Sequence, residues 1–72
     1  MNNLNVAKIQ LNGDPFEIID GTNLNQLLNK LKIEKNKVAI EVNGEIIEKK
    51  KYPKLILSKD DKVEIVQFIG GG

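Results

Sequence analysis

The sequence predicts a small α+β domain in which one helix covers a mixed β-sheet. Several segments alternate apolar and polar residues, as strands with one buried face do, and only one segment repeats leucine at helical spacing. The chain has 72 residues and no cysteine, so no disulfide can stabilise it. Its stability must therefore come from one compact apolar core, which its 40% hydrophobic content allows.

The first element is predicted to be a β-hairpin. Residues 6–11 alternate, and their inward face holds Ala7, Ile9 and Leu11. Residues 12–15, Asn-Gly-Asp-Pro, predict a tight reversal because asparagine and glycine tolerate positive φ and proline fixes φ. Residues 16–19 then resume an extended pattern and should return antiparallel to the first strand.

A single amphipathic helix is predicted over residues 23–32. Thr22 precedes it and is expected to be its N-cap. Leucine recurs along it at helical spacing, at Leu24, Leu27, Leu28 and Leu31. Such a stripe is more typical of a helix that covers a sheet than of one that fills a partner's groove, so we expect it to lie in the core.

A second hairpin follows a lysine-rich connection. Residues 38–42 alternate, and their inward face holds Val38, Ile40 and Val42. Asn43-Gly44 is a strong hairpin signal because a two-residue type I′ turn needs positive φ at both positions. Residues 45–48 should return as a short antiparallel strand.

An irregular crossover and a final strand complete the chain. Residues 49–54 are polar apart from Tyr52 and Pro53 and are expected to be a solvated crossover. Residues 55–57 form a short apolar anchor, and a turn then leads to an alternating last strand over residues 63–68.

The order of these elements predicts how they assemble. Placing the last strand centrally and parallel to the first brings all the inward residues against the leucine stripe. That arrangement is a β-grasp, with a mixed sheet of four to five strands and one main helix. We expect one domain over residues 1–72, with residues 70–72 as a flexible tail.

Composition excludes most kinds of side-chain chemistry. The chain has no Cys, His, Trp or Arg, and single copies of Ser, Thr and Tyr. Thiolate and imidazole metal sites are therefore excluded, and a nucleophile lacks its commonest base. Half of the ten carboxylates lie in turn-like contexts where solvation is the simpler role. We predict no catalytic side chain, no metal site and no bound cofactor.

The glycine run at residues 70–72 directs attention to the C-terminus. Three extended residues reach about 10 Å, and without Cβ atoms they pass through slots too narrow for other residues. Gly70 and Gly71 are thus predicted to thread into a partner, so that the carboxylate of Gly72 arrives in its active site. The alternative interpretation is an ordinary frayed end.

A docking patch is predicted beside this tail. If Val63 and Ile65 point inward, Val66 and Phe68 point to the opposite face of the sheet, where Ala39 should also lie. Exposed apolar side chains next to a reactive tail are typical of an interaction surface. The alternative is scattered surface residues, which are normal.

Nucleic acid and membranes are not expected partners. Lys49, Lys50, Lys51 and Lys54 surround Tyr52, but without arginine there is no bidentate base readout, and a net charge of +1 gives no general attraction. No apolar run approaches the length of a membrane span. Absence of cysteine fits a reducing cytosol, so we expect a cytoplasmic protein that is monomeric when free.

Three segments resemble one family. The Asn43-Gly44 turn after residues 38–42, the Asp60-Asp61-Lys62 turn into residues 63–66, and the ending Gly70-Gly71-Gly72 are similar to the small sulfur carrier proteins of thiamine biosynthesis, a ubiquitin-like β-grasp family. The resemblance covers about Leu4 to Gly72. The terminal diglycine is shared with the wider ubiquitin-like group, whereas the compact length and the Val-Glu-Ile-Val ending favour the thiamine branch.

The resemblance implies a carrier function. A C-terminal carboxylate, with a pKa of about 3.3–3.7, is anionic at neutral pH and must be activated before a nucleophile attacks it. In the family, a ubiquitin-activator-like enzyme uses ATP to adenylate the terminal glycine, here Gly72. Sulfur from a cysteine desulfurase relay then gives a thiocarboxylate, which donates sulfur to thiazole synthase. The chain would be a protein cosubstrate rather than an enzyme.

Two other functions remain open from the residues. One is a related β-grasp carrier that delivers sulfur to molybdopterin or transfer RNA, or is conjugated to proteins. The other is a noncovalent ubiquitin-like binding module that never uses its terminus.

Overall fold

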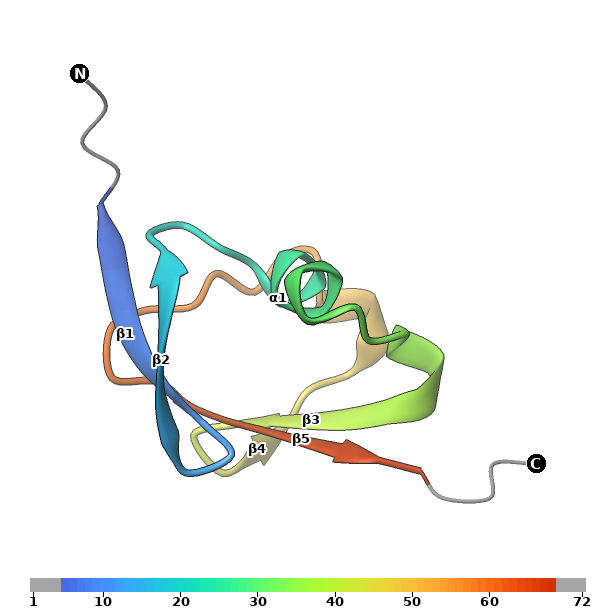
Figure 1. The fold of residues 1–72 in the computed structure, drawn as a ribbon. Coiled ribbons are helices and arrows are strands. Elements are labelled where there is room, and N and C mark those ends of the chain that lie inside the picture. The colour runs from blue at the N-terminus through green and yellow to red at the C-terminus, as the bar shows by residue number, and fades with distance from the viewer. Residues whose placement is uncertain (1–4, 69–72) are drawn as a thin grey trace.

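Five strands form one mixed sheet, and a single α-helix lies across one of its faces (Figure 1). The structure is a computed structural model and describes residues 5–68. Its elements are β1 (Val6–Leu11), β2 (Asp14–Ile19), α1 (Leu24–Leu31), the 3₁₀ turn η1 (Lys35–Lys37), β3 (Val38–Val42), β4 (Glu45–Ile46), the 3₁₀ turn η2 (Lys49–Lys51) and β5 (Lys62–Gln67).

The last strand occupies the middle of the sheet. The strand order is β2-β1-β5-β3-β4, with β5 parallel to β1 and antiparallel to β3. The predicted β-grasp arrangement is thereby confirmed. Because β5 is central and last, its C-terminal end leaves the sheet at the side away from the start of β1 (Figure 1).

The core forms between α1 and the inner face of the sheet. The predicted inward residues of β3 are all buried, as are Leu24, Leu27 and Leu28 of the leucine stripe, whereas Leu31 is only partly buried. Ala7 and Ile9 of β1 are buried as well, and Leu11 packs at the margin of the core. The strand phases read from the sequence are therefore correct.

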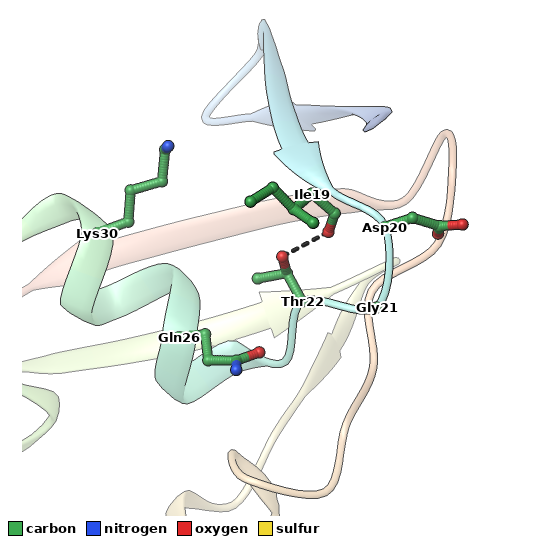
Figure 2. A pocket seen from close by; sticks show the side chains of 6 residues that line it. All are labelled: Ile19, Asp20, Gly21, Thr22, Gln26 and Lys30. Carbon is green, nitrogen blue, oxygen red and sulfur yellow. Dashed lines mark hydrogen bonds between the residues drawn. The ribbon is translucent and has the colours of Figure 1, made fainter. Parts of the chain in front are cut away.

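The helix cap differs from the prediction. Asn23, not Thr22, is the N-cap: its Oδ1 accepts from the Gln26 amide at 2.8 Å, and Gln26 Oε1 accepts from the Asn23 amide at 2.9 Å. This reciprocal capping box satisfies two helix-terminal donors. Thr22 is unsuited to that role because its hydroxyl already donates to the Ile19 carbonyl (Figure 2).

The first turn is tighter than predicted. Asn12 and Gly13 alone form it, with φ of 50° and 88°, and β2 already begins at Asp14. Two positive φ angles in succession fit a type I′ turn. Pro15 therefore lies within a strand, which it tolerates because β2 is at the edge of the sheet and the Pro15 nitrogen faces away from β1.

The crossover is not fully solvated, contrary to the prediction. Tyr52 follows the turn of η2 and is completely buried, together with Leu57 of the apolar anchor. Burial raises the pKa of the Tyr52 hydroxyl above its usual value near 10.0, and the Ile40 backbone offsets this only in part. Tyr52 is therefore a neutral core residue and supplies no base at physiological pH.

Candidate functional site

Strand β5 is bound to its neighbours on both sides over its first half. The Asn12 amide donates to the Val63 carbonyl at 2.9 Å, and the Asn43 amide donates to the Lys62 carbonyl at 2.7 Å. Both donors belong to Asn-Gly turns, one at the end of β1 and one at the end of β3. The two hairpins thus grip the start of β5 from opposite sides.

The side chains of these two asparagines form further hydrogen bonds to β5 and the turn before it. Asn12 Oδ1 accepts from the Ile65 amide at 2.7 Å, and Asn12 Nδ2 donates to the Ile65 carbonyl at 3.3 Å. Asn43 Oδ1 accepts from the Lys62 amide at 2.9 Å, and its Nδ2 donates to Asp61 Oδ1 at 3.0 Å. Sequence reasoning identified both turns but missed this role, because an Asn-Gly pair indicates a turn and says nothing about a strand far along the chain.

The second half of β5 leads out of the domain. The Phe68 amide donates to the Lys37 carbonyl at 2.9 Å, and the described part of the chain ends there. The predicted threading residues Gly70 and Gly71 and the predicted modified residue Gly72 lie outside the described residues.

The predicted docking residues lie together on the outer face of the sheet, opposite α1. Val66 pairs directly with Ala39 across β5 and β3, and Phe68 follows two positions later. The side chains of Val66 and Phe68 are 58% and 53% exposed, and Ala39 is half-buried. We call these three residues the docking patch.

Lys49 fixes the end of this patch. Its Nζ lies 5.8 Å from the centroid of the Phe68 ring and donates to the Val38 carbonyl at 3.1 Å. A cation over an aromatic face is attracted by the ring quadrupole. Sequence reasoning assigned Lys49 to a solvated crossover, and the pattern of a lysine run carries no signal that one member turns back onto the sheet.

Two carboxylates border the patch. Glu41 and Glu64 are directly paired across β3 and β5, two residues along each strand from the Ala39–Val66 pair. Like charges in opposite positions repel. The ion pairs within residues 5–68 lie elsewhere, on exposed side chains: Lys37–Glu34 at 3.7 Å and Lys51–Glu48 at 3.9 Å.

A hollow at the other end of the molecule offers no catalytic arrangement. Figure 2 shows Asp20 and Lys30 there pointing in different directions. Within residues 5–68, no group of three or more potential metal-ligating side chains is present. The residues that line the hollow are Ile19, Asp20, Gly21, Thr22, Gln26 and Lys30.

No helix in the described part of the chain combines the length and the apolar character needed to cross a bilayer. The only α-helix in that part, α1, has eight residues.

The solved structures include one with the same fold and a related sequence. The thiamine biosynthesis protein ThiS from Geobacter metallireducens superposes with a TM-score of 0.78 at 31% sequence identity, covering 90% of this chain and 99% of that one.

Sequence comparison gives the family. The sulfur carrier protein ThiS of Bacillus subtilis is 38% identical over 65 residues, which is 89% of this chain and 98% of that protein. A thiazole synthase of Magnetococcus marinus is 43% identical over 65 residues, or 90% of this chain, but the chain spans only 20% of that relative's length. The ThiS family profile matches residues 9–72. The chain therefore belongs to the ThiS family, the sulfur carrier proteins of thiamine biosynthesis.

Proposed function

We propose that this chain carries sulfur on Gly72 for the thiazole ring of thiamine. The Gly72 carboxylate attacks the α-phosphorus of ATP and releases pyrophosphate, giving a glycyl adenylate. Sulfide (HS⁻) then attacks the glycyl carbonyl and displaces AMP, which leaves a thiocarboxylate; if the relay delivers a persulfide instead, a second thiol must reduce the resulting acyl disulfide to the thiocarboxylate. Activation is needed because the free carboxylate is anionic and unreactive towards nucleophiles.

Membership of the ThiS family is the observation that carries this proposal. The fold supports it, because β5 is central, is bound on both sides over its first half and ends at the margin of the domain. A rigid strand that ends there gives the following residues a fixed starting point. Ile69-Gly70-Gly71-Gly72 then follow in the sequence, and glycine lets them pass a narrow channel.

Thiazole synthase is the proposed acceptor of the sulfur. A segment similar to this chain makes up a fifth of the length of relatives named thiazole synthase. Because a carrier-like segment and the rest of thiazole synthase are joined in one chain in some organisms, we expect the corresponding separate chains to bind each other in others. The adenylating enzyme and the cysteine desulfurase relay are further proposed partners. ATP is a substrate of the adenylating enzyme, and the carrier contributes no catalytic side chain.

The docking patch is the proposed contact with these partners. Val66 and Phe68 present apolar surface at the end of β5, and the half-buried Ala39 is paired with Val66 beside them. Aromatic residues at the centre of a contact contribute most of the binding energy in many interfaces. A patch at this position would also fix the direction in which the tail leaves.

Intact-mass spectrometry tests the proposal. The chain is incubated with ATP, the adenylating enzyme and sulfide, and conversion to the thiocarboxylate adds about 16 Da because sulfur replaces oxygen. Deletion of Gly72 should abolish the product, since the carboxylate then stops about 3.5 Å short. Gly71→Val should also block it, because a β-branched side chain adds bulk.

The matched control is Asn2→Ala, at the opposite terminus, which should react as the wild type does. Full conversion of both tail variants would contradict the proposal and leave the terminus without a carrier role.

A further inference from the structure

The second half of β5 has a free edge on its β1 side. Backbone groups of successive strand residues point alternately to the two neighbouring strands. Phe68 and Lys62 bond towards β3 and its flanking turns, whereas Val63 and Ile65 bond to Asn12 on the β1 side. By this alternation, the N–H and C=O of Gln67 face the β1 side.

β1 ends before it reaches Gln67. It pairs with β5 only through Gln10 with Lys62 and Leu11 with Val63, and the Asn12 side chain adds one further step at Ile65. The chain then turns away into β2 (Figure 1). Within residues 5–68, the backbone N–H and C=O of Gln67 therefore point to the β1 side of β5, where no strand is present to pair with them.

A basic groove runs beside this free edge. It is lined by the residue that ends α1, the segment that follows it, and the end of β5: Lys32, Ile33, Glu34, Lys37, Gln67 and Phe68. Lys49 adds a further positive charge over Phe68. Two lysines and one glutamate line the groove, and Lys37 pairs with Glu34 at 3.7 Å, so Lys32 leaves the lining with a net positive charge that favours an acidic partner.

We propose that the free edge at Gln67 accepts an extended segment of the adenylating enzyme as an added strand, with an acidic side chain of that segment in the groove beside Lys32. Strand addition of this kind takes its affinity from backbone hydrogen bonds. Gln67 precedes Gly72 by five residues, a reach of about 17 Å, so an added strand would set the direction of the tail. The inference rests on the proposed function.

Two variants at one position test the edge. Gln67→Ala removes the side chain and keeps the N–H, whereas Gln67→Pro removes the side chain and the N–H. Gln67→Pro should raise the KM for the carrier in adenylation at least fivefold above Gln67→Ala with kcat unchanged, as expected when uniform binding is lost. The two variants should melt at similar temperatures, because this N–H has no partner within residues 5–68.

Amide exchange in the wild-type chain gives a second readout that does not depend on a variant folding. Without ATP, added enzyme should slow exchange of the Gln67 amide at least tenfold. The Ile65 amide, already bonded to Asn12 Oδ1 at 2.7 Å, should exchange slowly with or without enzyme.

The outcomes separate this inference from the proposed function. A wild-type chain that is never adenylated overturns both. Normal adenylation of the wild type, with equal KM for the two Gln67 variants and an unprotected Gln67 amide in the complex, overturns the added strand alone.

Discussion

The two halves of β5 differ although they form one continuous strand. In the first half, Val63 and Ile65 are 1% and 9% exposed, and backbone bonds run to both neighbouring hairpins. In the second half, Gln67 continues the inward alternation of Val63 and Ile65 but is exposed, and the strand is paired only with β3 and its flanking turn. Both the burial of the strand and its pairing with β1 therefore decrease within a few residues.

This contrast shows how a very small domain can combine a stable core with an exposed strand end. The first half anchors β5 in the core, and the second half leaves backbone groups and apolar side chains exposed. Substitutions in the first half should therefore act on the free energy of unfolding, and those in the second half on association.

The largest effect on stability is expected from Ile65→Ala. Ile65 is buried and packs in the core, so the substitution removes buried methyl groups and leaves a cavity, at a cost of about 2–4 kcal/mol. Val66→Ala, one position on, should cost less than about 1 kcal/mol. Urea unfolding of the two variants measures this, and equal losses would show that Val66 is packed as Ile65 is and that its outward phase is wrong.

A smaller loss of stability is expected when the two side-chain hydrogen bonds from Asn12 to Ile65 are removed. Asn12→Gly keeps a residue that tolerates the positive φ of 50° but deletes both side-chain bonds to Ile65, at a cost of about 1–2 kcal/mol. Asn43→Gly is the matched control at the other turn.

Amide exchange distinguishes the two asparagines. The Ile65 amide should exchange faster in Asn12→Gly and stay protected in Asn43→Gly, whereas the Lys62 amide should respond in the opposite way. An Ile65 amide that is equally protected from exchange in both variants would show that the Asn12 side chain does not hold β5.

Periodicity was enough to predict the fold, because each strand buries one face. The alternation in β1, β3 and β5 and the leucine stripe of α1 determined which residues lie in the core, and the need to cover them determined the central position of β5. The predicted docking residues came from the same alternation, since the residues between the buried ones must face outward. Their role in binding stays a prediction.

Contacts between distant segments were not predictable in this way. Tyr52 lies in a polar run and is nevertheless buried, because the chain after η2 places it in the core beside the start of α1. Asn12 bonds to a residue 53 positions away, and Lys49 to the Phe68 ring. Each contact depends on the three-dimensional path of a loop, and single-sequence periodicity carries no information about that path.

A small gain in stability is expected at the turn into β5. Asp60 has a φ of 70°, in the left-handed region that favours glycine, while its amide donates to the Lys8 carbonyl at 2.9 Å. Asp60→Gly should relieve the strain and raise the free energy of unfolding by about 0.5–1 kcal/mol. Asp60→Ala, which removes the carboxylate but keeps a Cβ, should give no such gain in the same urea titration. An equal gain in both variants would show that removal of the negative charge, and not relief of backbone strain, raises the stability.

The smallest effect on stability, under about 0.5 kcal/mol, is expected from Phe68→Asp, directly after β5. The loss of a cation–π contact with Lys49 is offset when the new carboxylate meets the same ammonium group. Binding to the adenylating enzyme should nonetheless weaken at least tenfold, because a charge would enter an apolar contact. Ile46→Asp provides the control, since Ile46 is 72% exposed on the same face but outside the docking patch. If calorimetric titration finds that both variants bind the enzyme equally weakly, the docking patch has no specific role in binding. If Phe68→Asp instead lowers the free energy of unfolding strongly, the Phe68 ring lies in the core and the two halves of β5 do not differ as described.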